Sequence, residues 1–381
     1  MKKVAILGCT GSIGRQALEV IRANPDKFKV TAICAGRDAV RVAEQAAEFS
    51  PDYIGMAEGV AGDKLKGLGV KGRIISGPEA SCEIAALEQA DIIVNGISGY
   101  AGMRPLLAAL KAGKTVALAN KESIVCAHGL VKDALAKHGG SIIPVDSEQS
   151  AIFQCLAAGS HGEVDRLILT ASGGPFRTYT KEQLRFVTPR QAGNHPTWRM
   201  GPKITIDSAT LFNKGLEIME ASYLFDIPGK RISVLVHPES IVHSMVEFRD
   251  GCTMAQLSMP DMRLAIQYAL TYPERICGEF GRLSLEKAGK LTFFAPDREK
   301  FPALDLAYEA LKDGRRLPIA YNGANEVAVE LFLQGKVRFT DIWEVVEYAM
   351  AHMDKGEITS LDDIEQTDRQ ARELAMRKGT N

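Results

Sequence analysis

The sequence lacks any hydrophobic run that approaches the roughly 20 residues needed to cross a bilayer. It also lacks a charge excess, because 46 lysines and arginines stand against 47 aspartates and glutamates, for a formal net charge of -1. A surface so close to neutral gives no reason to expect nucleic acid or an anionic membrane as a partner. The remaining composition is the usual balance of a globular protein.

Cysteine patterns of a disulfide framework or a zinc site are absent as well. The seven cysteines are odd in number, no CxxC occurs, and most lie within apolar stretches, as reduced core residues do. The N-terminal apolar stretch stops at Gly8 and runs into a glycine motif, so we interpret it as a first strand and not as a signal or transit peptide. We therefore expect a cytoplasmic protein.

The first 150 residues alternate short strand patterns with helix patterns. Strands are expected at Lys3–Leu7, Lys29–Ala35, Tyr53–Met56, Asp91–Asn95, Thr115–Ala119 and Ser141–Val145, and helices at Ile13–Ala23, Ala39–Phe49, Met103–Ala112 and Ser123–His138. Nearly continuous apolar runs are typical of strands buried on both faces of a parallel sheet. The order predicts an α/β domain with a doubly wound, Rossmann-like sheet and ligands at the carboxyl ends of its strands.

The rest of the chain does not continue this regular alternation of strands and helices. Between about 147 and 270, strands expected at Asp165–Ser172, Arg231–Val236 and Thr253–Ser258 are separated by long loops rich in glycine and proline, which predicts a central α+β domain. A less regular connector covers roughly 270–300. Helices expected at Leu304–Leu311, at Ala324–Leu333 and from Ile342 to Met350, the last with Thr340 as N-cap, predict a C-terminal helical bundle.

A glycine motif follows the first expected strand. Gly8, Gly11 and Gly14 are spaced GxxGxxG rather than GxGxxG, but the physical need is the same: a tight turn and a close approach of the backbone to a pyrophosphate at a helix N-terminus. Thr10 and Ser12 can add hydroxyl hydrogen bonds. The alternative is an ordinary βα turn. Because the motif lies between a strand and a helix, it favours a dinucleotide site.

The end of the second expected strand indicates which dinucleotide is bound. An NAD enzyme would usually place an acidic residue there for the ribose 2′-hydroxyl, whereas the first charge here is Arg37, which could pair with a 2′-phosphate. This favours NADP(H). The alternative is a solvated arginine, since exposed arginines are common.

A pair of carboxylates follows the strand expected at 141–145. In extended chain Asp146 and Glu148 would point to the same face, where two carboxylates could hold Mg²⁺ or Mn²⁺. A third ligand would have to come from elsewhere, and Glu217 offers one. Spacing alone favours the alternative, in which the pair belongs to a solvated loop or a helix cap.

Several polar groups suit an anionic substrate. Lys121 stands at the end of a strand, where a lysine can bind an oxyanion or orient a hydroxyl; the alternative is an exposed lysine that opens the next helix. Ser172 precedes two glycines and can form an anion-binding nest. Ser208, Asn213 and Lys214 together would suit a phosphate monoester, although each alone is more often a turn or cap residue.

The segment 190–203 is rich in glycine and proline and carries His195 and Trp198. An aromatic side chain in such a loop could close over a bound substrate. Alternatively, Trp198 is buried against the surface of the domain.

Taken together, these segments resemble the 1-deoxy-D-xylulose 5-phosphate reductoisomerase family. The match runs in collinear order over the whole chain and comprises GCTGSIG at 8–14, LANKES at 118–123, PVDSEQSAIFQCL at 144–156, LTASGGPF at 169–176, NHPTWRMGPKITIDSATLFNKGLEIMEA at 194–221, HPESIVHSMVEF at 237–248, MPDMRLAI at 259–266 and NEVAV at 325–329. One such motif would mean little, whereas the full set is specific.

The resemblance implies an activity and its cofactors. Members of the family convert 1-deoxy-D-xylulose 5-phosphate into 2-C-methyl-D-erythritol 4-phosphate in non-mevalonate isoprenoid biosynthesis, by retro-aldol and aldol steps followed by hydride transfer from NADPH. They use Mg²⁺, Mn²⁺ or Co²⁺, form homodimers and are inhibited by the phosphonohydroxamate fosmidomycin. For this chain the resemblance therefore implies a metal- and NADP-dependent oxidoreductase whose partners are a sugar phosphate and a second copy of itself.

The resemblance also implies residue roles. NADPH binding falls on Thr10, Gly11, Ser12, Ile13, Gly36, Arg37, Asp38, Asn120, Glu122 and Gly201. The metal ligands are Asp146, Glu148 and Glu217. Substrate contacts fall on Lys121, Ser147, Glu148, Ser172, His195, Ser208, Asn213, Lys214 and Glu217, of which Lys121, Glu148 and His195 are expected to be catalytic. Trp198 and Met200 match the loop that covers the site. The segment Gly36-Arg37-Asp38 differs from the GKN-like form expected of the family.

These assignments divide the chain into an NADPH-binding domain at 1–146, a catalytic domain for metal and substrate at 147–270, a connector at 271–300 and a C-terminal helical bundle at 301–381. Two other functions fit parts of the pattern. A homoserine-dehydrogenase-like enzyme would share the strand end at Ala119-Asn120-Lys121 but would not need Asp146 together with Glu217. A non-catalytic NADPH sensor would bind the dinucleotide without turnover.

Overall fold

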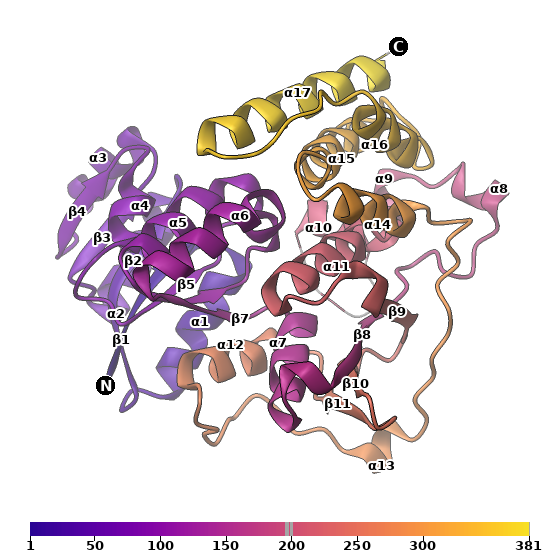
Figure 1. Ribbon diagram of the computed structural model, residues 1–381. Coiled ribbons are helices and arrows are strands. Elements are labelled where there is room, and N and C mark those ends of the chain that lie inside the picture. Colours follow the sequence, from indigo (N-terminus) through magenta and orange to yellow (C-terminus); the bar gives the residue numbers. More distant parts are fainter. Residues whose placement is uncertain (195–197, 199–200, 381) are drawn as a thin grey trace. The chain divides into compact units, whose positions relative to one another are not determined.

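The computed structural model describes residues 1–194, 198 and 201–380. It confirms the predicted α/β fold class, with a parallel Rossmann-like sheet, a second sheet and a helical C-terminal region (Figure 1). The chain forms two compact units, of which the first comprises residues 1–123, 128–150 and 261–281, and the second comprises 124–127, 151–260 and 282–381. Within the described residues, no helix has the length and apolar character needed to span a membrane.

The first unit is built on a seven-stranded parallel sheet. Its strands are β1 (Lys2–Leu7), β2 (Phe28–Ala35), β3 (Tyr53–Met56), β4 (Arg73–Ser76), β5 (Ile92–Asn95), β6 (Thr115–Leu118) and β7 (Ser141–Pro144), in the order β4-β3-β2-β1-β5-β6-β7. Each neighbouring pair is parallel. The strand order reverses between β1 and β5, and a ligand crevice is expected where it does.

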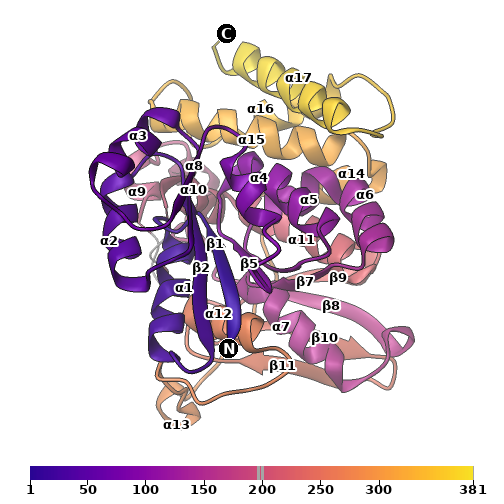
Figure 2. The ribbon, with the colours of Figure 1, turned by 90° about the vertical axis from the view of Figure 1, so that its left-hand side faces the viewer.

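Helices cover both faces of this sheet. They are α1 (Ser12–Ala23), α2 (Ala39–Phe49), α3 (Gly59–Gly67), α4 (Ala80–Ala85), α5 (Met103–Lys111), α6 (Lys121–His138) and α12 (Met262–Thr271), with a short 3₁₀ helix, η1 (Gly99–Gly102). Helices α1 and α12 pack together on one face, and α4, α5 and α6 lie on the other (Figure 2).

The sequence patterns missed some of these elements. Strand β4 lies at the edge of the sheet and is partly exposed along its whole length, so it carries no buried apolar run of the kind that marked its neighbours. Helices α3, α4 and α12 were missed too. Helix α12 lies outside the alternating N-terminal segment and joins the first unit only through tertiary packing.

The second unit contains a mixed sheet. Its strands are β8 (Val164–Ala171), β9 (Ile232–Val236), β10 (Val242–Phe248) and β11 (Thr253–Leu257), in the order β11-β10-β8-β9. Strand β10 runs antiparallel to both β8 and β11, whereas β8 and β9 are parallel. Strand β10 escaped prediction because polar His243 and Ser244 are buried within it, which breaks the apolar pattern.

The remaining elements are mostly helical. They are α7 (Ser147–Cys155), α8 (Lys181–Leu184), α9 (Pro189–Ala192), α10 (Pro202–Thr210), α11 (Phe212–Phe225), α13 (Leu285–Ala288), α14 (Ala303–Asp313), α15 (Leu317–Leu333), α16 (Asp341–Ala351) and α17 (Leu361–Thr380), with the 3₁₀ helices η2 (Leu156–Ala158), η3 (His161–Glu163) and η4 (Gly229–Arg231). Helix α15 packs against α14, α16 and α17 (Figure 1). Thr340 occupies the N-cap position of α16, as predicted, although its side chain makes no capping hydrogen bond.

Cysteine usage agrees with the sequence argument. All seven thiols are free, and Cys9, Cys34, Cys126 and Cys155 are buried. Burial raises the pKa of Cys34 to about 12, which keeps the group a neutral core thiol.

Candidate active site

The glycine motif forms a tight turn at the switch point of the sheet. Gly8 adopts a left-handed φ of 76°, and the amide of Gly11 donates to its carbonyl at 3.0 Å. A Cβ atom on Gly14 would lie 2.3 Å from that carbonyl oxygen, so only glycine lets α1 start this close to the loop. Gly11 is the N-cap of α1 and offers no side-chain cap, which leaves the first amides of the helix open to an anion.

The segment after β2 lies at the same edge of the sheet, because β2 pairs in parallel with β1. Arg37 is exposed there. The Asp38 carboxylate accepts the amide of Arg41 at 3.1 Å and caps α2. The structure therefore shows a local role for Asp38 and leaves Arg37 as the charged group turned to solvent.

Asn120 joins the ends of β5 and β6. Its amide nitrogen donates to the carbonyl oxygens of Ile97 and Gly99, each at 2.7 Å, and its amide oxygen accepts the amide of Ser123 at 2.9 Å, which caps α6. The side chain thus fixes the loop after β5 against the start of α6. Glu122 follows in the first turn of this helix.

Lys121 and Asp146 come from neighbouring strand ends. Lys121 opens α6 directly after β6, Asp146 follows β7, and these two strands are paired in parallel. The Lys121 ammonium group forms an ion pair with the Asp146 carboxylate, and the Lys121 side chain is only 6% exposed. Lysines are rarely buried unless they are paired with an opposite charge. Lys121 does open α6, but it is buried, so the alternative of an exposed lysine at this position was wrong.

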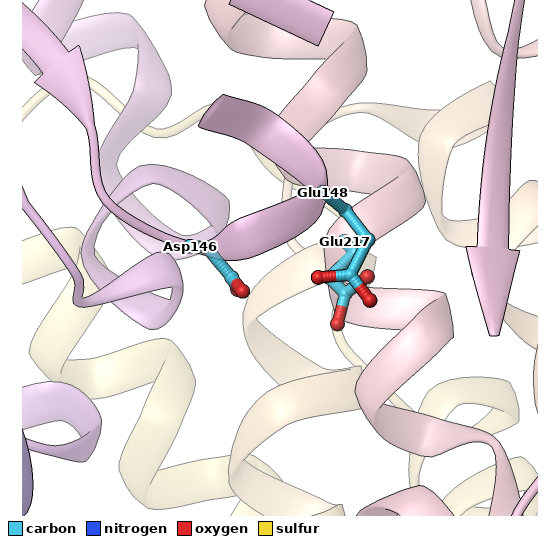
Figure 3. Close-up of side chains that lie close together, drawn as sticks. All are labelled: Asp146, Glu148 and Glu217. Carbon is cyan, nitrogen blue, oxygen red and sulfur yellow. The ribbon is translucent and has the colours of Figure 1, made fainter. Parts of the chain in front are cut away.

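Three carboxylates converge, as the sequence suggested. Asp146, Glu148 and Glu217 each offer one oxygen atom, and these atoms lie within 4.8 Å of one another (Figure 3). The reason given from sequence for the pairing of Asp146 with Glu148 was wrong, because the chain is not extended there. The Asp146 carbonyl accepts the amide of Ser150 at 2.8 Å, and α7 starts at Ser147, so Glu148 lies in a helical first turn.

Helix α11 supplies the third carboxylate together with two of its partners. Asn213 and Lys214 stand in the first turn of α11, and both contact the Glu217 carboxylate, the first by a hydrogen bond and the second by an ion pair. Lys214 and Glu217 are almost fully buried. The spacing i, i+3 and i, i+4 places all three side chains on one face of the helix.

The turn after β8 lies directly against α10. Gly173 and Gly174 adopt left-handed φ values of 80° and 66°, and a Cβ atom on Gly174 would meet the Ser208 carbonyl oxygen at 2.9 Å. The structure therefore brings Ser172 and Ser208 to adjacent segments. The Gly174 amide donates to the Ser172 hydroxyl at 3.2 Å, so one amide of the expected nest has a partner within the turn.

Of the remaining residues expected at the site, the structure describes Ser147, Gly201 and Trp198. Ser147 donates a hydrogen bond to the Glu148 carboxylate, and Gly201 is the N-cap of α10. Trp198 is half-buried, with its ring centroid 6.2 Å from that of His243. His195 and Met200, expected as a substrate contact and a lid residue, lie outside the described residues.

Two residues at the switch point escaped the sequence analysis. Asn95 ends β5, is fully buried, and donates to the Gly102 carbonyl at 2.9 Å. Gly96 follows, and a Cβ atom on Gly8 would lie 2.7 Å from its carbonyl oxygen, so this loop packs directly on the glycine turn. The dipeptide Asn95-Gly96 at the end of a buried strand was the available signal.

Fold and site together define the protein's class: a Rossmann-like α/β protein with a phosphate-type glycine turn and a carboxylate cluster that could hold a metal ion. Three family profiles match the chain. They describe 1-deoxy-D-xylulose 5-phosphate reductoisomerase at residues 4–128, its C-terminal domain at 142–225 and the DXP reductoisomerase C-terminal domain at 257–374. The chain belongs to the 1-deoxy-D-xylulose 5-phosphate reductoisomerase family.

Individual relatives agree over full length. The reductoisomerase of Chlorobium limicola is 50% identical over 98% of this chain and 99% of its own, and that of Chlorobaculum tepidum is 48% identical over the same shares. The Zymomonas mobilis enzyme in complex with NADPH superposes with a TM-score of 0.93 at 42% identity, covering 99% of this chain and 98% of its own. A reductoisomerase structure with NADPH, fosmidomycin and magnesium has a TM-score of 0.93 at 41% identity, covering 100% and 98%.

Proposed function

We propose that this chain converts 1-deoxy-D-xylulose 5-phosphate into 2-C-methyl-D-erythritol 4-phosphate with NADPH and a divalent metal ion. Family membership over the whole chain supports this reaction. The observation that carries it is the convergence of Asp146, Glu148 and Glu217 in a chain whose parallel sheet has a phosphate-type glycine turn. A homoserine dehydrogenase or an NADPH sensor would not require that third carboxylate.

The three carboxylates suit Mg²⁺ or Mn²⁺ as proposed ligands. Hard cations take oxygen donors at about 2.1 Å, which places neighbouring ligand oxygens roughly 3 Å apart and opposite ones roughly 4 Å apart. The observed oxygens lie within 4.8 Å of one another, so small side-chain movements would bring them to that spacing around an ion. A bound ion would act as a Lewis acid on the substrate's ketone oxygen and a neighbouring hydroxyl group.

Two of the three carboxylates form ion pairs with lysines. Lys121 pairs with Asp146, and Lys214 pairs with Glu217. In the proposed reaction Lys121 orients a substrate hydroxyl, Glu148 contacts the reacting part of the sugar and His195 is a further catalytic contact. Ser147 and Glu217 complete the contacts with the sugar.

The phosphate group would bind at Ser172, Ser208, Asn213 and Lys214. The packing of the Ser172 turn on α10 at Ser208 supports this set, as does the position of Asn213 and Lys214 in the next helical turn. Binding energy gained at a remote phosphate can be used to close a loop and exclude water from the reacting carbons. Trp198 and Met200 are the proposed loop residues.

NADPH would bind along the carboxyl edge of the first sheet. The proposed contacts are Thr10, Gly11, Ser12, Ile13, Gly36, Arg37, Asp38, Asn120, Glu122 and Gly201. The open amides at the start of α1 suit the pyrophosphate, and exposed Arg37 suits the 2′-phosphate. The side chain of Asn120 is occupied by protein hydrogen bonds, so its contact would come through the backbone.

Residues 1–146 would then serve NADPH binding and 147–270 metal and substrate binding, with 271–300 as a connector and 301–381 as a helical support.

We further propose a cytoplasmic homodimer. Strand β11 is an edge strand, and its first three residues are exposed, including Met254 at 44%. An open edge with an exposed apolar side chain is an aggregation hazard unless a partner covers it, and a second copy of the same strand can do so symmetrically. Sedimentation of Met254→Lys against wild type checks this, since an unchanged dimer would exclude the edge as the interface.

A direct assay tests the reaction. Protein, NADPH, Mg²⁺ and 1-deoxy-D-xylulose 5-phosphate are mixed, and nicotinamide absorbance is followed. Glu217→Gln should remove turnover while leaving NADPH binding nearly intact, whereas Glu309→Gln, an exposed position on α14, should behave as wild type. Lack of turnover by wild type would favour a sensor, and full activity of Glu217→Gln would refute the metal assignment.

A further inference from the structure

The turn between α10 and α11 has an unusual backbone at a buried residue. Leu211 separates the two helices with φ 64° and ψ 10°, a left-handed conformation that branched L-residues adopt only when the surroundings enforce it. Its side chain is 4% exposed and belongs to the core of the second unit. Ser208 lies in the last turn before this residue, and Asn213 and Lys214 lie in the first turn after it.

Carbonyl groups on both sides of Leu211 accept hydrogen bonds from the C-terminal helices. The Trp343 indole N–H, on α16, donates to the Thr210 carbonyl at 3.3 Å. The Tyr321 hydroxyl, on α15, lies 3.3 Å from the Phe212 carbonyl oxygen and 3.1 Å from that of Ala303, and its single proton is shared between them. Both donors are buried. The two carbonyls that flank the left-handed residue are therefore held by side chains more than a hundred positions away.

A third contact holds α10 itself. The Asn325 amide on α15 donates to the Asp207 carboxylate at 2.8 Å, and both residues are buried. The same carboxylate is paired with Lys203, one turn earlier, at 2.7 Å. Asp207 directly precedes Ser208, so this contact sets the rotation of the last turn of α10.

A glycine on α11 leaves the space that the Tyr321 hydroxyl occupies. A Cβ atom on Gly215, in the first turns of α11, would lie 1.9 Å from the Tyr321 hydroxyl oxygen. Burial, with the nearby Asp207 charge, raises the pKa of Tyr321 well above its ordinary value, so the hydroxyl remains a donor at any physiological pH.

From these contacts we propose that Tyr321, Asn325 and Trp343 are positioning residues, which we call the junction clasp, and that they hold the α10–α11 turn in the geometry that presents Ser208, Asn213 and Lys214 to the substrate phosphate. This inference rests on the proposed function of those three residues. It gives the C-terminal helices a part in substrate binding, although none of the clasp residues would touch the substrate.

Tyr321→Phe tests the clasp, with Tyr308→Phe as its matched control. Tyr308 also donates its hydroxyl to a backbone carbonyl of the second unit, that of Ile232 at 3.0 Å, but away from the turn. Both variants lose one tyrosine–carbonyl hydrogen bond and should lose similar thermal stability. Only Tyr321→Phe should raise the KM for 1-deoxy-D-xylulose 5-phosphate and the Kd for fosmidomycin, by about fivefold, since one hydrogen bond is worth roughly that factor.

The Kd for NADPH supplies a second control, because the proposed dinucleotide contacts lie mostly in the first unit, and it should stay within about twofold of wild type in both variants. Trp343→Phe keeps an aromatic ring and removes the hydrogen-bond donor, so it should show the same changes in KM and Kd as Tyr321→Phe. It also tests the clasp if the Tyr321→Phe variant does not fold. Equal KM and fosmidomycin Kd in wild type, Tyr321→Phe and Trp343→Phe would overturn the clasp. Absent wild-type turnover would instead refute the proposed reaction, and the fosmidomycin titration would still report on the clasp.

Discussion

Lys121 and Asp146 form an ion pair in which the two side chains are only 6% and 14% exposed. The pair joins the first residue of α6 to the second residue after β7, so it ties two neighbouring strand ends together. A lysine that neutralises one carboxylate of a candidate metal site has two possible relations to a bound cation: it can compete with the ion for that carboxylate, or it can serve the substrate beside it.

The two members of this pair should respond differently to substitution. Asp146→Asn removes a proposed ligand, so the Kd for Mn²⁺ should rise at least as much as the roughly 10–100-fold that a lost supporting contact costs. Lys121→Met removes a competing cation, so Mn²⁺ should bind as well as or better than in wild type while kcat falls. Calorimetric titration with Mn²⁺ and steady-state assays check both, and weaker Mn²⁺ binding in Lys121→Met would show that the lysine supports the ion.

Arg37 should decide the preference for NADPH over NADH. A charge-assisted hydrogen bond is worth about 1.5–3 kcal/mol, so Arg37→Gln should raise the KM for NADPH about tenfold or more and leave that for NADH nearly unchanged. Arg41→Gln is the matched control, because Arg41 is an exposed arginine in the first turn of α2, with its Nε atom 3.8 Å from the Asp38 carboxylate. A parallel loss with both nucleotides would show that Arg37 acts on the fold and not on the 2′-phosphate.

Trp198 should report on ligand binding through its fluorescence. It is half-buried near His243, whereas Trp343, the only other tryptophan, is 6% exposed in the core of the second unit. Addition of fosmidomycin with NADPH and Mg²⁺ should shift or quench the emission of wild type, and Trp198→Phe should abolish most of that change. Emission that stays constant on binding would contradict closure of the loop over the ligand.

His128 predicts a loss of stability in mild acid. Burial, with the nearby charge of Lys132, lowers the pKa of His128 below its ordinary value. The unfolded chain therefore takes up a proton near pH 6.5 before the folded protein does, so stability is full above that pH and declines as the pH falls towards the folded-state pKa.

Replacement of this group should flatten the pH profile. Thermal unfolding between pH 7.5 and about pH 5 should show a smaller decline in Tm for His128→Gln than for wild type, because the proton-linked contribution is gone. His138→Gln, an exposed position at the end of the same helix, should keep the wild-type slope. Identical slopes for all three proteins would assign the acid sensitivity to other groups.

Much of this protein followed from local sequence. The apolar runs ending at Leu7, Ala35 and Asn95 predicted a parallel sheet, because strands buried on both faces consist mostly of apolar residues. The glycine spacing at 8–14 predicted a phosphate-type turn, because only glycine fits where α1 meets the loop. Residue types alone also drew attention to Asp146, Glu148 and Glu217, and the family motifs joined them in one hypothesis.

Only the tertiary structure decided how these pieces meet. Whether Glu217 reaches Asp146 depends on packing across a long stretch of chain, which no local periodicity encodes. Asp146 and Glu148 were expected in an extended segment, but a helix starts at Ser147 instead. The Ser150 amide donates to the Asp146 carbonyl and closes the first turn of that helix. The left-handed turn at Leu211 could not be foreseen either, because its conformation is held by Tyr321 and Trp343, donors supplied by helices that fold from a distant part of the sequence.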